Sequence, residues 1–124
     1  MINSKARPRK CRNTPTVLDG IKFQSKREAA RYAELKLLER AGQISHLELQ
    51  PKFKFMVEGR PLLIRSKGYP NGRQAGYKAD FSYMDKRGER IVEDVKSPAS
   101  RTQAYALRKA LVEACWGVTI KEVD

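Results

Sequence analysis

The 124-residue sequence has few of the residues that crosslink small proteins through disulfides or metals. It contains two cysteines, Cys11 and Cys115, and a single histidine, His46. No CxxC or Cys/His cluster occurs, which argues against a structural zinc site. Cys115 falls in an apolar helical stretch, so we expect a buried free thiol there. His46 lies on an extended segment without a partner and is expected at the surface.

Long apolar runs and nucleotide-binding loops are missing as well. The first residues lack the apolar core of a signal peptide, and no run approaches the ~20 apolar residues of a membrane-spanning helix. No G-x-x-x-x-G-K-[ST] sequence is present, and the glycines between residues 68 and 76 form no phosphate-binding signature. These absences favour a soluble cytoplasmic protein with no membrane partner.

Positive charge is what the sequence has in excess. It contains 26 Lys and Arg against 14 Asp and Glu, which gives a formal net charge of +12. Such an excess favours a polyanionic partner, because each neutralised phosphate releases condensed counterions. Nucleic acid is favoured over an anionic membrane surface, since no basic helix carries a wide aromatic and leucine face. The charge could alternatively serve solubility alone.

The chain is predicted to divide into a flexible basic arm, residues 1–15, and one compact domain, residues 16–124. The arm holds five basic residues and two prolines with almost nothing apolar, so it could lie along a phosphate backbone. A domain of this length can bury a core without disulfides or a structural metal.

Turn and capping signals define the first half of the domain. Asp19-Gly20 between two apolar triplets predicts a hairpin over residues 16–23. Ser25 and Glu28 have capping-box spacing and begin a helix over residues 26–41. That helix is apolar around much of its circumference and is expected to be well buried. Extended stretches over 44–49 and 52–57 follow, and the proline- and glycine-rich stretch from 59 to 76 is predicted to be a loop.

Alternation defines the second half. Residues 77–84 alternate as one strand, with its aromatic residues and Ala79 on one face and Asp80 on the other. The remaining elements expected are a turn at 85–88, a strand over 89–96, a helix over 102–115 and a strand over 118–123. This order predicts an α/β fold in which helices flank a mixed central sheet.

The residues that could carry chemistry are Asp80, Asp94 and Lys96. Asp94 and Lys96 share one strand face, and a hairpin would bring Asp80 beside them. Aspartate is unfavourable inside strands, and buried charge is costly unless it is paired or bound to metal. Two converging carboxylates suit Mg²⁺, which can supply an activated water. The alternative is an exposed cross-strand ion-pair set on a solvated face.

Asp80 followed by Glu93-Asp94-Val95-Lys96 resembles the PD-(D/E)xK nuclease superfamily, whose restriction-endonuclease-like core runs αβββαβ. Residues 18–123 also resemble small phage and prophage proteins placed in that superfamily. This closer likeness lies in Asp19-Gly20-Ile21-Lys22-Phe23-Gln24-Ser25-Lys26-Arg27-Glu28 with Ala29-Ala30-Arg31-Tyr32, in Leu37-Leu38-Glu39 and in Leu49-Gln50-Pro51. One departure is Ala79, which stands where the superfamily often has proline.

The resemblance implies roles for individual residues. Asp80 and Asp94 would be catalytic metal ligands for Mg²⁺ or Mn²⁺, and Lys96 would be the catalytic lysine. Glu28 matches a helix glutamate that many members add as a catalytic ligand, although a capping box alone also explains it. Glu93 is expected on the opposite strand face, so the ligand role is assigned to Asp94.

The resemblance further implies a Mg²⁺-dependent DNA endonuclease, phage-encoded and active in the cytoplasm of a bacterial host. A short core without an added recognition domain favours junction, flap or single-stranded DNA. A homodimer would suit junction cleavage. The alternative is a catalytically inactive nucleic-acid-binding phage accessory protein with the same fold. An RNA-binding module is less favoured, because no aromatic-rich strand motif is present.

Several further residues are candidates for contact with DNA or for supporting roles. Roles for Gln50, Gln103 and Tyr105 near the site are left open. The basic residues expected to contact DNA are Arg60, Arg65, Lys67, Arg73, Lys78, Arg101 and Arg108.

Overall fold

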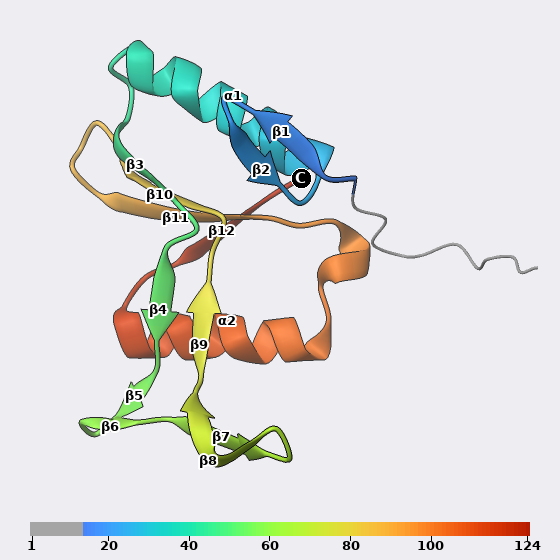
Figure 1. The fold of residues 1–124 in the computed structure, drawn as a ribbon. Coiled ribbons are helices and arrows are strands. Elements are labelled where there is room, and N and C mark those ends of the chain that lie inside the picture. Colours follow the sequence, from blue (N-terminus) through green and yellow to red (C-terminus); the bar gives the residue numbers. More distant parts are fainter. Residues whose placement is uncertain (1–13) are drawn as a thin grey trace, which may run out of the picture.

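A mixed four-stranded sheet lies at the centre of the computed structural model, which describes residues 14–124 (Figure 1). The strand order is β12 (Ile120–Val123), β11 (Arg90–Val95), β10 (Phe81–Met84) and β3 (Ser45–Leu49). Strands β3, β10 and β11 pair antiparallel, and β12 joins β11 in parallel. The predicted mixed sheet is confirmed. Most of the predicted basic arm, with Cys11, lies outside the described residues.

Two helices cover opposite faces of this sheet. Ile91 and Val95 on β11 pack in the cluster below α1 (Lys26–Arg40), whereas Val92 packs with residues of α2 (Gln103–Trp116). Neighbouring residues of a strand point to opposite faces, so the sheet separates the two helices, as Figure 1 shows. This confirms the predicted α/β class. The restriction-endonuclease-like core itself stays a prediction. Within residues 14–124, no helix is long and apolar enough to cross a membrane.

Helix α1 begins and ends where the sequence predicts. The Ser25 hydroxyl accepts the Glu28 N–H at 3.1 Å, and Gly42 follows the helix with a φ of +77°. The expectation that this helix would be well buried is wrong for one face. Leu37 is 62% exposed and Leu38 37% exposed, because only one side of α1 lies against the sheet and the N-terminal hairpin.

The hairpin of β1 (Thr16–Leu18) and β2 (Ile21–Phe23) is confirmed, with positive φ at both Asp19 and Gly20. Helix α2 also agrees, since the Thr102 hydroxyl caps its start. The prediction of a buried Cys115 is wrong. The buried stripe of α2 runs through Tyr105 and Val112, and Cys115 lies off that stripe and is exposed.

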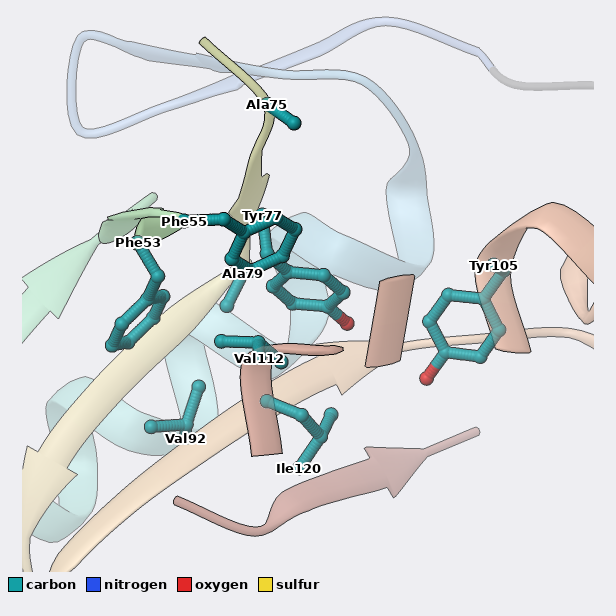
Figure 2. Packing of buried hydrophobic residues seen from close by; sticks show 9 residues of the cluster. All are labelled: Phe53, Phe55, Ala75, Tyr77, Ala79, Val92, Tyr105, Val112 and Ile120. Carbon is teal, nitrogen blue, oxygen red and sulfur yellow. The ribbon is translucent and has the colours of Figure 1, made fainter. Parts of the chain in front are cut away.

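The single strand predicted over 77–84 is broken in two. Strand β9 (Gly76–Lys78) pairs with β4 (Lys52–Lys54), and β10 starts only at Phe81. Tyr77 and Ala79 pack on the α2 side (Figure 2), whereas Phe81 packs on the α1 side. The predicted common face is therefore wrong, because the chain bends at Asp80 and the alternation changes sides there.

The loop predicted from Gly59 to Gly76 is also wrong, because this stretch is mostly strand. Its elements, with the strand before it, are β5 (Met56–Val57), β6 (Arg60–Pro61), β7 (Leu63–Ser66) and β8 (Tyr69–Gln74). Glu58 and Gly59 both have positive φ and form a turn, so these loop-like residues connect strands. We call the β7–β8 pair the ribbon. It lies beyond α2, away from α1 (Figure 1).

Candidate active site

Asp80 and Asp94 are connected by two hydrogen bonds, in which the carboxylate of each aspartate accepts a backbone N–H from the strand of the other. The Asp80 N–H donates to Asp94 Oδ1 at 3.0 Å, and the Val95 N–H donates to Asp80 Oδ2 at 2.8 Å. The hairpin that pairs Phe81 with Glu93 produces this contact, because it places Asp80 beside the end of β11. Each carboxylate is thereby held in one orientation. The structure brings these two predicted site residues together.

The bend that presents Asp80 is held by main-chain bonds. The Gln50 N–H donates to the Asp80 carbonyl at 2.9 Å, and the Ala79 N–H donates to the Pro51 carbonyl at 3.0 Å. The ladder between β3–β4 and β9–β10 therefore continues through the bend. Gln50 has a φ of +51° and an exposed side chain, so its observed contribution is made by its backbone.

Asp94 is buried with one oxygen unpartnered. The residue is 2% exposed, and Oδ2 has no hydrogen-bond partner within the described part of the chain. Burial raises the pKa of Asp94 to about 6, although the Lys96 ammonium acts in the opposite direction. A buried acceptor without a partner is costly. This oxygen is therefore suited to bind a proton or a cation.

Glu28 approaches the two aspartates from the first turn of α1. Its side chain accepts the Gln24 N–H at 3.4 Å and lies close enough to the Asp80 carboxyl to be affected by its charge. Burial and the Asp80 carboxyl raise the pKa of Glu28 to about 7. The Ser25 hydroxyl forms its half of the capping box, but the Glu28 carboxyl lies toward Asp80. Glu28 therefore caps the helix with its backbone and joins the aspartates with its side chain.

Lys96 lies two residues after Asp94 and is positioned by α2. Its Nζ is 4.3 Å from the centroid of the Tyr105 ring, a distance that suits a cation–π contact. The Tyr105 hydroxyl donates to Glu122 at 2.8 Å, which fixes the ring. Figure 2 shows Tyr105 reaching from α2 toward the core residues. The role left open for Tyr105 thus becomes a contact with the predicted catalytic lysine.

Glu122 is a third acidic neighbour that the sequence reasoning missed. It lies in register with Asp94 on the parallel strand β12, and its charge helps to raise the pKa of Asp94. Glu122 also pairs with Arg101 and Lys109, each at 3.4 Å. The hydrogen bond from Tyr105 and the Lys109 charge hold the pKa of Glu122 below its usual range. Only the alternation of the last strand could have indicated this residue.

Glu93 lies on the opposite face, as the alternation predicts. It is fully buried, and Arg31 donates to it from Nε at 2.8 Å and from Nη2 at 2.7 Å. The Tyr83 hydroxyl donates to the same carboxylate. Burial opposes ionisation of Glu93, but Arg31 and Tyr83 outweigh it and hold its pKa below the usual range. Glu93 is thus a paired structural carboxylate, separate from Asp94.

A family model covers most of the chain. Residues 8–119 match the family described as "Protein of unknown function (DUF1064)". The chain belongs to this family. No curated protein and no solved structure matches the DUF1064 chain.

The seven basic residues predicted to contact DNA are all exposed in the DUF1064 chain, but they do not form one cluster. Arg101 follows the short 3₁₀ helix η1 (Pro98–Ser100), pairs with Glu122 and lies 3.3 Å from Asp124. Arg108 on α2 lowers the pKa of Asp94 through its charge. Lys78 lies on β9, and the other four lie on β6 and the ribbon. His46 is exposed as predicted, and Gln103 is exposed at the start of α2.

The carboxylates fit a hard divalent cation in donor type and in charge. Across residues 14–124, no three His, Cys, Asp or Glu side chains form a ready-made ligand group. Mg²⁺ commonly binds through one or two carboxylates and retains waters, so a smaller set suffices. The buried, unpartnered Oδ2 of Asp94 is the donor atom that such an ion would satisfy. Burial is the main cause of the raised pKa values of Asp94 and Glu28, and neighbouring carboxylates add to it.

Proposed function

We propose that this DUF1064 protein is a metal-dependent DNA endonuclease of the PD-(D/E)xK type. The observation that carries the proposal is the hydrogen-bonded connection of Asp80 with Asp94, which leaves Asp94 Oδ2 buried and unpartnered near Lys96. A purely structural pair of carboxylates would be neutralised by cations, as Glu93 is by Arg31. The sequence resemblance to that superfamily supports the same assignment.

The residues of the site have separate tasks. Asp80, Asp94 and Glu28 would hold Mg²⁺ or Mn²⁺, which supplies an activated water and neutralises charge on the phosphate. The backbone N–H donors at Asp80 and Val95 keep the aspartates oriented before substrate arrives. The Lys96 ammonium would stabilise the charge that develops as water adds to phosphorus and the bond to the sugar oxygen breaks. That sugar oxygen leaves with a proton.

The substrate we propose is DNA with a junction, a flap or a single-stranded segment. The exposed basic residues supply phosphate contacts without any arrangement dedicated to a long base sequence. The likeness to phage and prophage proteins is the reason for proposing a phage-encoded enzyme of the bacterial cytoplasm. A homodimer would place two such sites on paired strands.

Cleavage assays test this proposal. Supercoiled, linear, single-stranded and four-way-junction DNA are incubated with Mg²⁺, Mn²⁺ or EDTA and the wild-type protein, Lys96→Ala or Asp94→Ala. We expect metal-dependent cleavage that falls at least about a hundredfold in both variants. Glu89→Gln, at the exposed start of the same β11 hairpin, is the matched control and should cleave like wild type.

Binding without cleavage on every substrate would contradict the proposal. It would favour the alternative, an inactive nucleic-acid-binding accessory protein with the same fold. Glu28→Gln separates the two roles of that residue. Lost cleavage without lost stability assigns the side chain to the site, whereas retained cleavage removes it from the site, since the backbone bond to Ser25 is the same in this variant.

A further inference from the structure

The ribbon has two different faces. Ile64 pairs with Arg73 across the ribbon, and the Arg73 guanidinium lies 5.6 Å from the centroid of the Tyr69 ring. These three side chains share one face, which we call the stacking face. Gly72 belongs to the other face, where a side chain would meet Leu63 at 3.2 Å. The stacking face therefore carries one aromatic ring, one guanidinium and one aliphatic side chain.

The stacking face is open to solvent. Tyr69 is 52% exposed and Ile64 is 41% exposed, although both are large apolar side chains. Tyrosine with an arginine over its ring offers flat surfaces on which a nucleobase can stack. Bases of a duplex are already stacked on each other and offer a protein only their edges. An unpaired base suits this face better than a base pair does.

The positive charge of the segment around the ribbon favours binding of a polyanion. Between Met56 and Gln74 four side chains are cationic, and Glu58 alone is acidic. None of the four cations forms an ion pair with a carboxylate of residues 14–124. They are therefore free to neutralise phosphates. The four are Arg60, Arg65, Lys67 and Arg73.

The ribbon is joined to the candidate active site by a continuous hydrogen-bonded ladder. The Phe55 N–H donates to the Ala75 carbonyl at 2.9 Å, and the Ala75 N–H donates to the Leu62 carbonyl at 2.8 Å. From there β9 leads directly to the bend at Asp80. Arg73 and Asp80 are seven residues apart, which is roughly 20 Å of extended chain. A strand held on the ribbon would thus be fixed relative to the site, several nucleotides from the cleaved phosphate.

We propose that the stacking face binds an unpaired DNA strand, with a base on Tyr69 and Arg73 and phosphates at the neighbouring cations. The inference rests on the proposed function and narrows the proposed substrates to DNA with a single-stranded arm, which the ribbon binds. The ribbon then distinguishes an unpaired arm from the duplex that carries it. The cations bind both forms of DNA, whereas the ring favours only the unpaired one.

Fluorescence anisotropy with a labelled oligo(dT) strand and a blunt duplex of equal length, both in EDTA, tests this inference. Tyr69→Ala should weaken binding of the single strand about tenfold and change duplex binding less than about twofold. Tyr69→Phe keeps the ring and should bind like wild type. Arg73→Gln should weaken both complexes and lower the slope of log affinity against log salt by about one.

Matched controls separate stacking from charge and from folding. Arg87→Gln removes the same charge from the exposed β10–β11 turn and should leave the preference for the single strand unchanged. Unchanged thermal melting of Tyr69→Ala confirms that the variant folds. Equal losses on both DNAs, or no loss, would overturn the inference. So would a dimer in sedimentation velocity that Tyr69→Ala dissociates without altering affinity for DNA.

The two proposals fail separately. Tyr69-dependent preference for the single strand, with no cleavage of any DNA, would keep the ribbon site and remove the nuclease. Cleavage lost in Lys96→Ala, with Tyr69→Ala indistinguishable from wild type in binding, would keep the nuclease and remove the ribbon site.

Discussion

Glu93 and Asp94 are neighbours on β11, are almost equally buried, and have opposite electrostatic surroundings. Glu93 faces α1, where Arg31 and Tyr83 satisfy its oxygens and its pKa is low. Asp94 faces the α2 side, where one oxygen has no partner and its pKa rises to about 6. Burial alone therefore does not determine what a carboxylate does. A paired carboxylate holds the fold together, and an unpaired one can bind a cation.

Breaking the ion pair between Arg31 and Glu93 should have the largest effect on stability. Arg31→Ala leaves Glu93 charged and buried without its partner, so the free energy of unfolding should fall by about 3–5 kcal/mol. Urea denaturation measures this loss. Glu34→Ala removes the exposed carboxylate that also pairs with Arg31 and should cost less than about 1 kcal/mol. Similar losses in the two variants would contradict the account.

The raised pKa values of Asp94 and Glu28 predict an unusual dependence of stability on pH. Asp94 and Glu28 have ordinary pKa values of 3.8 and 4.5, which folding raises to about 6 and about 7. Above about pH 5, where the glutamates with lowered pKa values are largely ionised in both states, the folded state binds more protons at these two sites, so stability should fall as pH rises from about 5 to 7. We expect a loss of about 2–4 kcal/mol in EDTA, measured by urea denaturation. Stability that rises over this range would contradict the assignment.

A metal ion should oppose that loss. Mg²⁺ or Mn²⁺ binds the ionised carboxylates, so it should raise the melting temperature at pH 8 and have little effect at pH 5. Differential scanning calorimetry at the two pH values measures the shift. Asp94→Asn is the control and should show a much smaller metal response. An equal shift in this variant would place the metal elsewhere.

A change in the strand leading to Asp80 should have an intermediate effect. A side chain at Gly76 would lie 2.8 Å from the Phe53 carbonyl oxygen, within the β4–β9 pair. Gly76→Ala should therefore reduce the free energy of unfolding by about 1–3 kcal/mol. Gly68→Ala adds the same methyl group in open space and should change stability by less than about 0.5 kcal/mol. Equal effects would argue against a tight β4–β9 contact.

The smallest predicted effect concerns the ring beneath Lys96. Tyr105→Phe keeps the ring but removes the hydroxyl that donates to Glu122, and Tyr105→Leu also removes the cation–π contact. If Lys96 assists cleavage, the rate should fall about two- to fivefold in the Leu variant and less in the Phe variant. Single-turnover kinetics measure both. Urea denaturation separates this effect from lost packing.

Local signals in the sequence predicted much of the fold. Asp19-Gly20, Ser25 and Gly117 mark a turn, a helix start and a helix end because their chemistry acts on adjacent backbone. Alternation placed Glu93 and Asp94 on opposite faces, and the hairpin brought Asp80 beside Asp94.

The failures come from non-local structure. The bend at Asp80 is fixed by bonds to Gln50 and Pro51, about thirty residues away, so alternation along 77–84 could not reveal the change of side. The ribbon was missed because its glycines and proline resemble a loop, although only Gly68 lies in its turn and both Pro70 and Gly72 lie within β8. Glu122 reaches Asp94 through a parallel pairing that follows a crossover helix, and no spacing in the sequence encodes that register.

The most direct test compares activity with stability in Asp94→Asn. The substitution removes the buried charge while an oxygen remains to accept the Asp80 N–H. At pH 8 in EDTA we expect a more stable protein by about 1–2 kcal/mol, because the charge that burial disfavours is gone. In Mg²⁺ we expect junction DNA to be cleaved at least about a hundredfold more slowly. A variant that is less stable than wild type, or that cleaves within tenfold of it, would contradict the account.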